Sequence, residues 1–161
     1  MASVESGREV ILINDTVLGL PPEALSLDEG AKVFVAGRSL VQMTLAELAL
    51  PGAQMIWTDF RHSASLAALN AKLQAAGGLN RLILAADGAQ SEAVFSLMCA
   101  VLTFRSSLRR RRGARIDLIL EDGQAVGSMV EFLKRIGGTL DLDGIATELR
   151  ICERRSLPAV A

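Results

Sequence analysis

Tyrosine is absent from this chain of 161 residues, aromatic residues make up 4% of it, and it contains only two cysteines and one histidine. Chemistry that needs a phenol as an acid or base therefore cannot use a side chain of this protein. Cys99 and Cys152 stand alone, one in a helical pattern and one in a strand pattern, so we expect two buried, reduced thiols. His62 has no second histidine or cysteine near it in the sequence, which predicts a surface or helix-capping position rather than a ligand or base.

An excess of charge of either sign is also missing. The 17 Lys and Arg residues nearly balance the 18 Asp and Glu residues, which leaves a formal charge of -1. Such a balance gives no long-range attraction to nucleic acid or anionic lipid, so we expect neither as a partner. No apolar run reaches the length of a transmembrane helix, and the first residues lack the basic-then-apolar pattern of a secretory signal. We therefore expect a cytoplasmic protein.

Apolar runs of strand length recur along the whole chain, and half of its residues are apolar. Several runs are apolar at successive positions, as in central parallel strands that are covered on both faces. The length fits one core, so we expect residues 1–161 to form a single domain. The expected strands span residues 10–14, 32–36, 54–58, 82–86, 116–120 and 148–152.

Helical patterns occupy the intervals between these strands. A short helix is expected after the first strand, with prolines 21–22 in its first turn, where a missing N–H costs little. Ser39 and Gln42 have the spacing of a capping box, and residues 51–52, Pro-Gly, end the helix that they open. A glycine pair at 77–78 closes the next helix as a C-cap. Three leucines share one face of that helix: Leu66, Leu69 and Leu73.

The later helices carry more apolar surface than one sheet can cover. Ser91 is expected to cap a long helix whose apolar positions form more than one stripe, which predicts a second buried surface. Arginines 109–112 end this helix, where cations complement the helix dipole. Another helix is expected over 125–136, ended by the glycines at 137–138. Homodimerisation is the simplest way to bury the second surface.

Strands that alternate with helices across short loops predict a parallel sheet with right-handed crossovers. Three segments and one residue carry a more specific likeness. They are G-A-K-V-F-V-A-G-R at 30–38, Asp59, G-G-L-N-R-L-I-L-A-A-D-G at 77–88, and D-L-D-G-I-A-T-E-L-R-I at 141–151. In this order and spacing they resemble the short-chain dehydrogenase/reductase family over residues 10 to about 152. The resemblance implies a three-layer, Rossmann-like, doubly wound α/β fold with about six parallel strands in the order 3-2-1-4-5-6.

The departures from the family fall on its cofactor loop. The family's T-G-x-x-x-G-x-G loop aligns with residues 14–21, where only Gly19 remains of three glycines. Asp15 would place a carboxylate beside the phosphates, and two unit charges about 4 Å apart at an effective dielectric near 20 repel by roughly 4 kcal/mol. The prolines at 21–22 delete N–H donors that would cradle a pyrophosphate. We therefore expect no bound cofactor, with NADP as the alternative.

The family's catalytic Tyr-x-x-x-Lys motif is absent. Its two positions fall on Gly123 and Gly127, or on Val130 and Lys134 in the other register, and the family's N-A-G asparagine is Ala85. A ketone reductase needs a hydroxyl of lowered pKa to protonate the nascent alkoxide. Neither register supplies that acid, so the sequence favours a non-catalytic protein.

Three residues are candidates for a remaining nucleotide site: Gly19, Arg38 and Asp59. An arginine at the end of the second strand would favour a ribose 2′-phosphate, and a solvated arginine is the other interpretation of Arg38. By the resemblance, Asp59 would accept a hydrogen bond from an adenine amine. It could equally cap the helix that follows it.

Two charged groups allow further interpretations. The carboxylates of Asp15, Asp87, Glu121 and Asp122 should lie at the carboxyl ends of strands. They could hold Mg²⁺ as in a phospho-acceptor receiver domain, with phosphorylation at Asp15 or Asp59, or they could be solvated loop acids. The arginines at 109–112, with Arg115, form either a solvated helix end or a docking patch for an acidic partner, since no interleaved aromatic residues favour nucleic acid.

Together these observations predict a non-catalytic, short-chain dehydrogenase/reductase-like homodimer that acts in binding or scaffolding. The resemblance implies dimerisation through the helices expected at 91–112 and 125–136, which form a four-helix bundle in the family. An unidentified protein partner is also possible for such a role. The alternative is an NAD(P)-binding oxidoreductase with an atypical cofactor site at Gly19, Arg38 and Asp59.

Overall fold

The computed structural model describes residues 8–16, 27 and 30–153. The helix expected after the first strand, with Gly19 and the proline pair, lies outside the described residues. None of the helices within the described ranges combines the length and apolarity that crossing a bilayer would need. The two cysteines are free, as expected, although both are half-buried and not fully buried.

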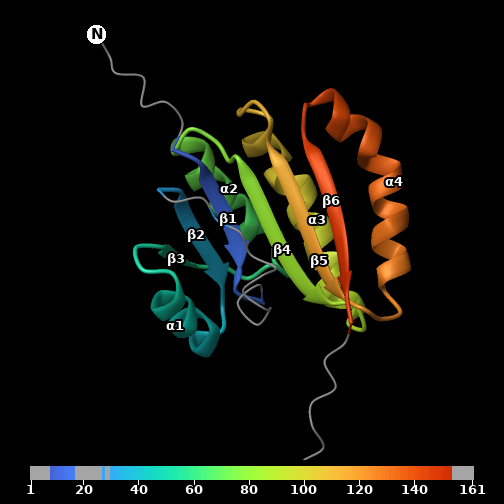
Figure 1. The fold of residues 1–161 in the computed structure, drawn as a ribbon, viewed down its shortest axis with the longest axis horizontal. Coiled ribbons are helices and arrows are strands. Elements are labelled where there is room, and N and C mark those ends of the chain that lie inside the picture. The colour runs from blue at the N-terminus through green and yellow to red at the C-terminus, as the bar shows by residue number, and fades with distance from the viewer. Residues whose placement is uncertain (1–7, 17–26, 28–29, 154–161) are drawn as a thin grey trace, which may run out of the picture.

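Six parallel strands form one sheet in the order β3-β2-β1-β4-β5-β6 (Figure 1). The predicted strand order is thereby confirmed. A receiver domain has a different order, with its first strand between its second and third, so the phospho-acceptor alternative is wrong. The strands are β1 Val10–Asn14, β2 Lys32–Gly37, β3 Gln54–Trp57, β4 Arg81–Asp87, β5 Arg115–Glu121 and β6 Ala146–Cys152.

Helices cover the sheet from both sides, which completes the three-layer architecture (Figure 1). On one face, leucines of α2 and α3 pack with β-strand residues such as Leu12 and Leu84 around the fully buried Phe104. On the other face, Met43 and Ala46 of α1 pack against β1 and β2. The predicted leucine face of α2 is confirmed, since all three leucines are buried. The helices are α1 Leu40–Ala49, α2 Ser63–Ala75, α3 Ser91–Leu108 and α4 Val126–Leu142.

The predicted start of α3 at residue 91 is confirmed, but the predicted cap and the predicted end of the helix were wrong. Ser91 is the first helical residue, and the N-cap is Gln90, whose side chain makes no capping bond. The helix ends at Leu108, so arginines 109–112 lie beyond it. The cause is a long-range contact, because the Ser107 carbonyl accepts a hydrogen bond from Leu79 N–H at 3.0 Å. In a longer helix that carbonyl would accept from a residue four positions later.

The glycine pair at 137–138 does not end α4, contrary to the sequence prediction. The helix continues to Leu142 and stops at Gly144, whose φ is 73°. The N–H of Ile145 donates to Leu140 O at 2.9 Å, which is the Schellman arrangement. Leu140 and Ile145 are both buried, so their packing sets the end of the helix. By contrast, the predicted C-cap of α2 is confirmed, with Gly78 N–H donating to Leu73 O at 2.9 Å.

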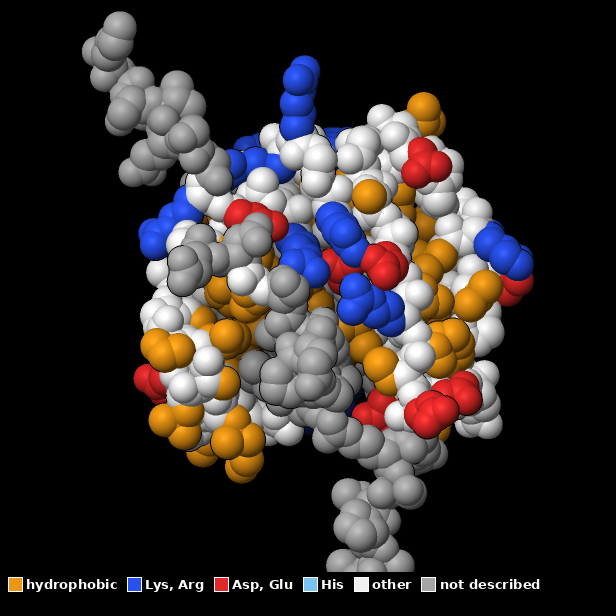
Figure 2. All heavy atoms as spheres, in the orientation of Figure 1, with side chains coloured by type: hydrophobic (Ala, Val, Ile, Leu, Met, Phe, Trp, Pro, Cys, Tyr) orange, Lys and Arg blue, Asp and Glu red, His pale blue; other side chains and the backbone are white. Residues whose placement is uncertain are grey.

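The amino-terminal part of β4, β5 and β6 carries charged side chains on the face opposite α3 and α4. Asp117 accepts from Arg81 at 2.7 Å and from Arg115 at 2.8 Å, and Arg115 also pairs with Glu148 of β6. Arg150 completes the series at 3.1 Å from Glu148. Figure 2 shows basic and acidic side chains side by side over this part of the sheet. We call these five residues the ion-pair ladder. Their charges make this region of the sheet surface hydrophilic.

Candidate functional site

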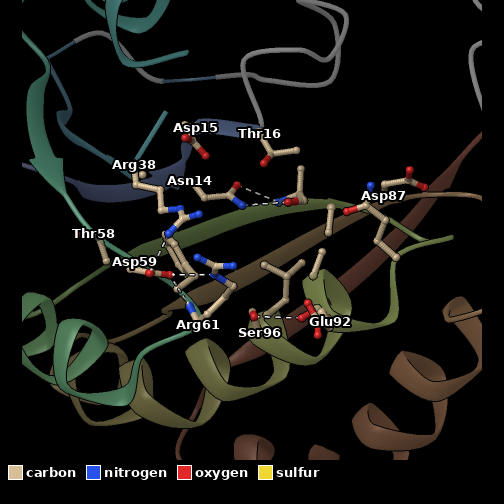
Figure 3. A pocket seen from close by; sticks show the side chains of 17 residues that line it. Asn14, Asp15, Thr16, Arg38, Thr58, Asp59, Arg61, Asp87, Glu92 and Ser96 are labelled. Carbon is tan, nitrogen blue, oxygen red and sulfur yellow. Dashed lines mark hydrogen bonds and ion pairs between the residues drawn. The ribbon is translucent and has the colours of Figure 1, made fainter. Parts of the chain in front are cut away.

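A cavity of about 490 Å³ opens at the carboxyl ends of β1, β2, β3 and β4, where α/β sheets of this kind bind ligands. Its walls come from loops that follow four strands and from the start of α3 (Figure 3). Arg38, Asp59 and Arg61 gather at one end, and Thr16 and Asp87 lie toward the other. Further lining residues are Asn14, Asp15, Gly37, Thr58, Phe60, Ala85, Ala86, Gln90, Glu92, Ala93, Ser96 and Leu97.

Two of the predicted site residues, Arg38 and Asp59, meet at one end of this cavity. Arg38 Nη1 lies 3.1 Å from Asp59 Oδ2, and the Arg61 N–H donates to Asp59 Oδ1 at 3.0 Å. The Arg61 side chain also approaches the same carboxylate, with Nε at 3.4 Å. The backbone N–H of Arg61, aided by the Arg61 and Arg38 guanidinium groups, lowers the pKa of Asp59 to about 2. Each of the two residues is thus already engaged by the protein itself.

Asp59 does not cap α2, so that interpretation of its role was wrong. The N-cap of α2 is His62, which makes no side-chain capping bond. The Asp59 carboxylate instead closes the turn that precedes the helix, through its bond from Arg61 N–H. His62 is exposed at the helix start, as the sequence predicted, with Nε2 3.7 Å from Asp59 Oδ2.

The lowered pKa of Asp59 predicts how its contribution to stability changes with pH. Because the folded-state pKa lies below the ordinary value, the contribution is complete above pH 3.8 and is lost as the pH falls toward 2. We expect Asp59→Asn to be less stable than the wild type at neutral pH and to approach it near pH 2. Urea unfolding of both proteins across this range measures the difference. A difference that stays constant with pH would contradict the assignment.

Asp15, which the sequence predicts beside the phosphates, lies at the junction of β2 and α1. Its Oδ2 accepts from the Ser39 N–H at 3.3 Å, so the carboxylate sits at the amino terminus of α1 and complements the helix dipole. The side chain lies directly against Gly37, where an added Cβ would come within 2.7 Å of Asp15 Cβ. The glycine at the end of β2 therefore makes room for this aspartate.

Asn14 has a role that the sequence analysis missed. Its buried amide donates to Ala85 O at 2.8 Å and its Oδ1 accepts from Ala85 N–H at 2.9 Å. The last paired residues of β1 and β4 are Ile13 and Ile83. The Asn14 side chain therefore continues the hydrogen bonding between these two strands beyond the backbone pairs. A signal was present, since an amide at the end of a fully apolar strand needs buried partners.

The acids at the strand ends do not gather into a metal site. Asp87 Oδ1 accepts from the Ala89 N–H at 2.9 Å, which closes the turn after β4. Over the described part of the chain, no three residues of the types His, Cys, Asp and Glu lie close enough together to hold a metal ion. The magnesium interpretation of Asp15, Asp87, Glu121 and Asp122 therefore has no geometric support there.

Comparison with known proteins supports the fold described above. No protein-family model matches the sequence, and no curated protein matches it. Solved structures do match. A protein from Burkholderia xenovorans described as a short-chain dehydrogenase/reductase superposes with a TM-score of 0.69 and 17% identity, covering 94% of this chain and 76% of its own. A short-chain dehydrogenase from Rhodopseudomonas palustris gives 0.65 and 13%, over 90% and 85%. A metagenomic short-chain oxidoreductase in complex with NADP gives 0.69 and 14%, over 90% and 82%.

The chain has the short-chain dehydrogenase/reductase fold. In the first of the two registers considered for the family's catalytic pair, its tyrosine position falls on Gly123, after β5. A Cβ there would lie 2.6 Å from the Gly88 carbonyl oxygen, so the loops after β4 and β5 leave no space for a side chain. The other position of that register, Gly127, lies exposed in α4 with open space around it. In this register, the positions of the family's tyrosine and lysine therefore supply no proton donor to the cavity of this short-chain dehydrogenase/reductase fold.

Proposed function

We propose that the protein is a non-catalytic homodimer of the short-chain dehydrogenase/reductase fold that acts by binding or scaffolding. The observation that carries this proposal is the placement of Asp15. Its carboxylate lies against Gly37 and the amino terminus of α1. The end of β2 is where dinucleotide-binding sheets meet the adenosine ribose. A ligand phosphate at that position would face a fixed negative charge.

The described residues of the cavity argue against a bound dinucleotide. The metagenomic oxidoreductase is described in complex with NADP, which raises the question for this chain. Recognition of a 2′-phosphate would use Arg38 and the N–H groups at the start of α1. Here Arg38 is paired with Asp59, and Asp15 accepts the hydrogen bond from the Ser39 N–H. A cofactor phosphate would have to compete with these two carboxylates.

The cavity also has no tyrosine, the residue that donates the proton in the family that the chain resembles. A reductase must deliver a proton to the developing alkoxide from a positioned group. The chain has no tyrosine, and Gly123 is packed too closely to be replaced by a larger residue. Asp59 is ionised at any ordinary pH because of its low pKa, so it is no substitute. These features support a binding role over turnover.

The dimer part of the proposal is supported by the exposed side of α3. Phe95 and Leu102 are 64% and 54% exposed, and their spacing of seven places them on one face with Met98 between them. A groove lined by Met98 and Phe132 runs between this face and α4. Large apolar side chains gathered in this way favour a covered interface. We propose that a second copy covers it through α3 and α4.

Cofactor titration tests the proposal directly. We expect no change in the melting temperature of the wild type with NADP(H) or NAD(H) at millimolar concentration. A ligand at a hundredfold excess over its Kd would add about 2.7 kcal/mol to the free energy of unfolding. Asp15→Gly is the matched variant, because it removes the carboxylate and restores a glycine of the family loop. A saturable shift in the wild type, or turnover of a carbonyl compound, would favour the oxidoreductase alternative with its site at Arg38 and Asp59.

A further inference from the structure

We propose that the outer face of α1, together with the edge of β3, is a second self-association surface that binds another copy of this chain. We call it the α1/β3 surface, and it comprises Leu40, Val41, Leu45 and Leu48 of α1 and Trp57 of β3. It lies at the opposite edge of the sheet from β6 and α4 (Figure 1). It is thus separate from the α3 and α4 interface proposed above.

The first observation is that α1 is apolar on both of its sides. Met43 and Ala46 are buried against the sheet. The four leucine and valine residues of the α1/β3 surface point the other way and are 50 to 75% exposed. Helical spacing places them on one continuous face. Figure 2 shows apolar side chains gathered at the lower left, where α1 lies in Figure 1.

The second observation extends this face onto the neighbouring strand. Met55 packs into the core beneath α1, whereas Ile56 packs on the opposite face of the sheet. Because side chains alternate along a strand, Trp57 points to the same side as Met55 and α1. It is 65% exposed. An indole and four aliphatic side chains therefore line one side of the molecule.

Charge selects among the partners that could cover such a surface. Glu47 is the one ionisable residue of α1, and β3 has none. Nucleic acids and anionic membranes are held through lysine and arginine, which α1 and β3 lack. The partner surface must then be apolar and nearly uncharged. The α1/β3 surface of a second copy meets that requirement without bringing many like charges together.

The edge strands point to the same occupant. Natural sheets protect exposed edges with charged residues, proline or bulges. The β6 edge carries Glu148 and Arg150, whereas β3 reads Gln-Met-Ile-Trp, is short at four residues and has neither a charged residue nor a proline. A two-fold axis would place the α1/β3 surface of one copy against the same surface of a second copy, with the β3 edges at the side of the contact. Such an isologous contact is the commonest form of homodimer interface.

The size of the surface is adequate for this contact. Five large apolar side chains, partly exposed, bring roughly 500 Å² per copy to the contact. A standard interface buries about 800 Å² per partner, and the backbone of the β3 edge adds to the side-chain area. With the α3 and α4 interface on another side, each copy could use both surfaces at once. A tetramer built as a dimer of dimers is the expected assembly.

Light scattering on purified full-length protein tests both interfaces in one design. We expect the wild type to be tetrameric, Leu45→Glu/Leu48→Glu to be dimeric, Phe95→Glu/Leu102→Glu to be dimeric, and the combination to be monomeric. All four positions are exposed, so the fold should survive, as circular dichroism would verify. Leu142→Glu is the matched control for the α1 variant, because Leu142 is 91% exposed and lies outside the α1/β3 surface.

Trp57 is the sole tryptophan of the chain and reports on the α1/β3 surface alone. Its emission should shift to longer wavelength on dilution and in Leu45→Glu/Leu48→Glu, and should not shift in Leu142→Glu. Unchanged mass and emission in the α1 variant would overturn this inference. A dimeric wild type that only the α1 variant dissociates would support it and overturn the α3 and α4 interface. A monomeric wild type at every concentration would overturn both, and leave the surface to another protein.

Discussion

Replacing Asn14 with leucine is expected to lower the free energy of unfolding by about 3 kcal/mol, because each buried backbone group left without a partner costs about 1–3 kcal/mol. The variant removes both hydrogen bonds to Ala85, one to its N–H and one to its carbonyl. Leucine has a similar volume, so the loss reports the polar groups and not a cavity. Urea unfolding at neutral pH measures it.

Asn80→Ala is the comparison for this experiment. Asn80 Oδ1 also reaches across the sheet and accepts from the Val10 N–H at 2.8 Å, but the site is only half-buried and a single bond is lost. Water can replace that bond, so we expect a loss of about 1 kcal/mol. If Asn14→Leu cost no more than Asn80→Ala, the Asn14 amide would not be holding β1 to β4. The cavity would then have to be shaped by packing alone.

Replacing Asp117 with alanine is expected to destabilise the protein by about 2 kcal/mol. Removing one partner from a fully buried ion pair costs about 3–5 kcal/mol, and the partial exposure of Arg115 reduces that loss. Asp117 is itself buried and binds both Arg81 and Arg115. Its removal would leave two guanidinium groups facing each other on β4 and β5. Thermal unfolding of the variant measures the effect.

Glu148→Ala is the control within the same ion-pair ladder. Glu148 pairs with Arg115 and Arg150, but Glu148 and Arg150 are exposed and Arg115 is only half-buried. Exposed pairs contribute about 0–1 kcal/mol, so this loss should be much smaller than that of Asp117→Ala. Equal losses would mean that burial of Asp117 does not decide the energetics of the ladder. High salt should reduce the effect of Glu148→Ala more than that of Asp117→Ala.

The strands and their order could be predicted because the signals are local and strong. Runs such as Val10–Asn14 are apolar throughout, and the glycine pair after α2 has the Schellman position that its sequence predicts. Helix ends that depend on distant contacts could not be predicted. Leu79 ends α3 by taking the Ser107 carbonyl, and the packing of Ile145 carries α4 past two glycines to Gly144.

The candidate site shows the same division. Arg38 and Asp59 could be placed at one cavity from their positions after β2 and β3, since parallel strands bring their carboxyl ends together. Their mutual ion pair, and the contact of Asp15 with Gly37, depend on segments more than twenty residues apart. Part of the ion-pair ladder could be predicted from the sequence, because Arg115 and Asp117 alternate with apolar residues in β5. That alternation marks a strand face that meets water.

The ion-pair ladder divides the face of the sheet that packs with α1 into an apolar part and a charged part, and the charged part lies over the amino-terminal part of β4, β5 and β6. An apolar element laid across the charged part would have to strip water from five charged groups that are already matched to one another, and such desolvation opposes docking. Assembly is thereby directed away from the charged face, toward α3 and α4 on the opposite face and toward the α1/β3 surface at the edge of the sheet. A scaffold built in this way would leave its charged face open to solvent.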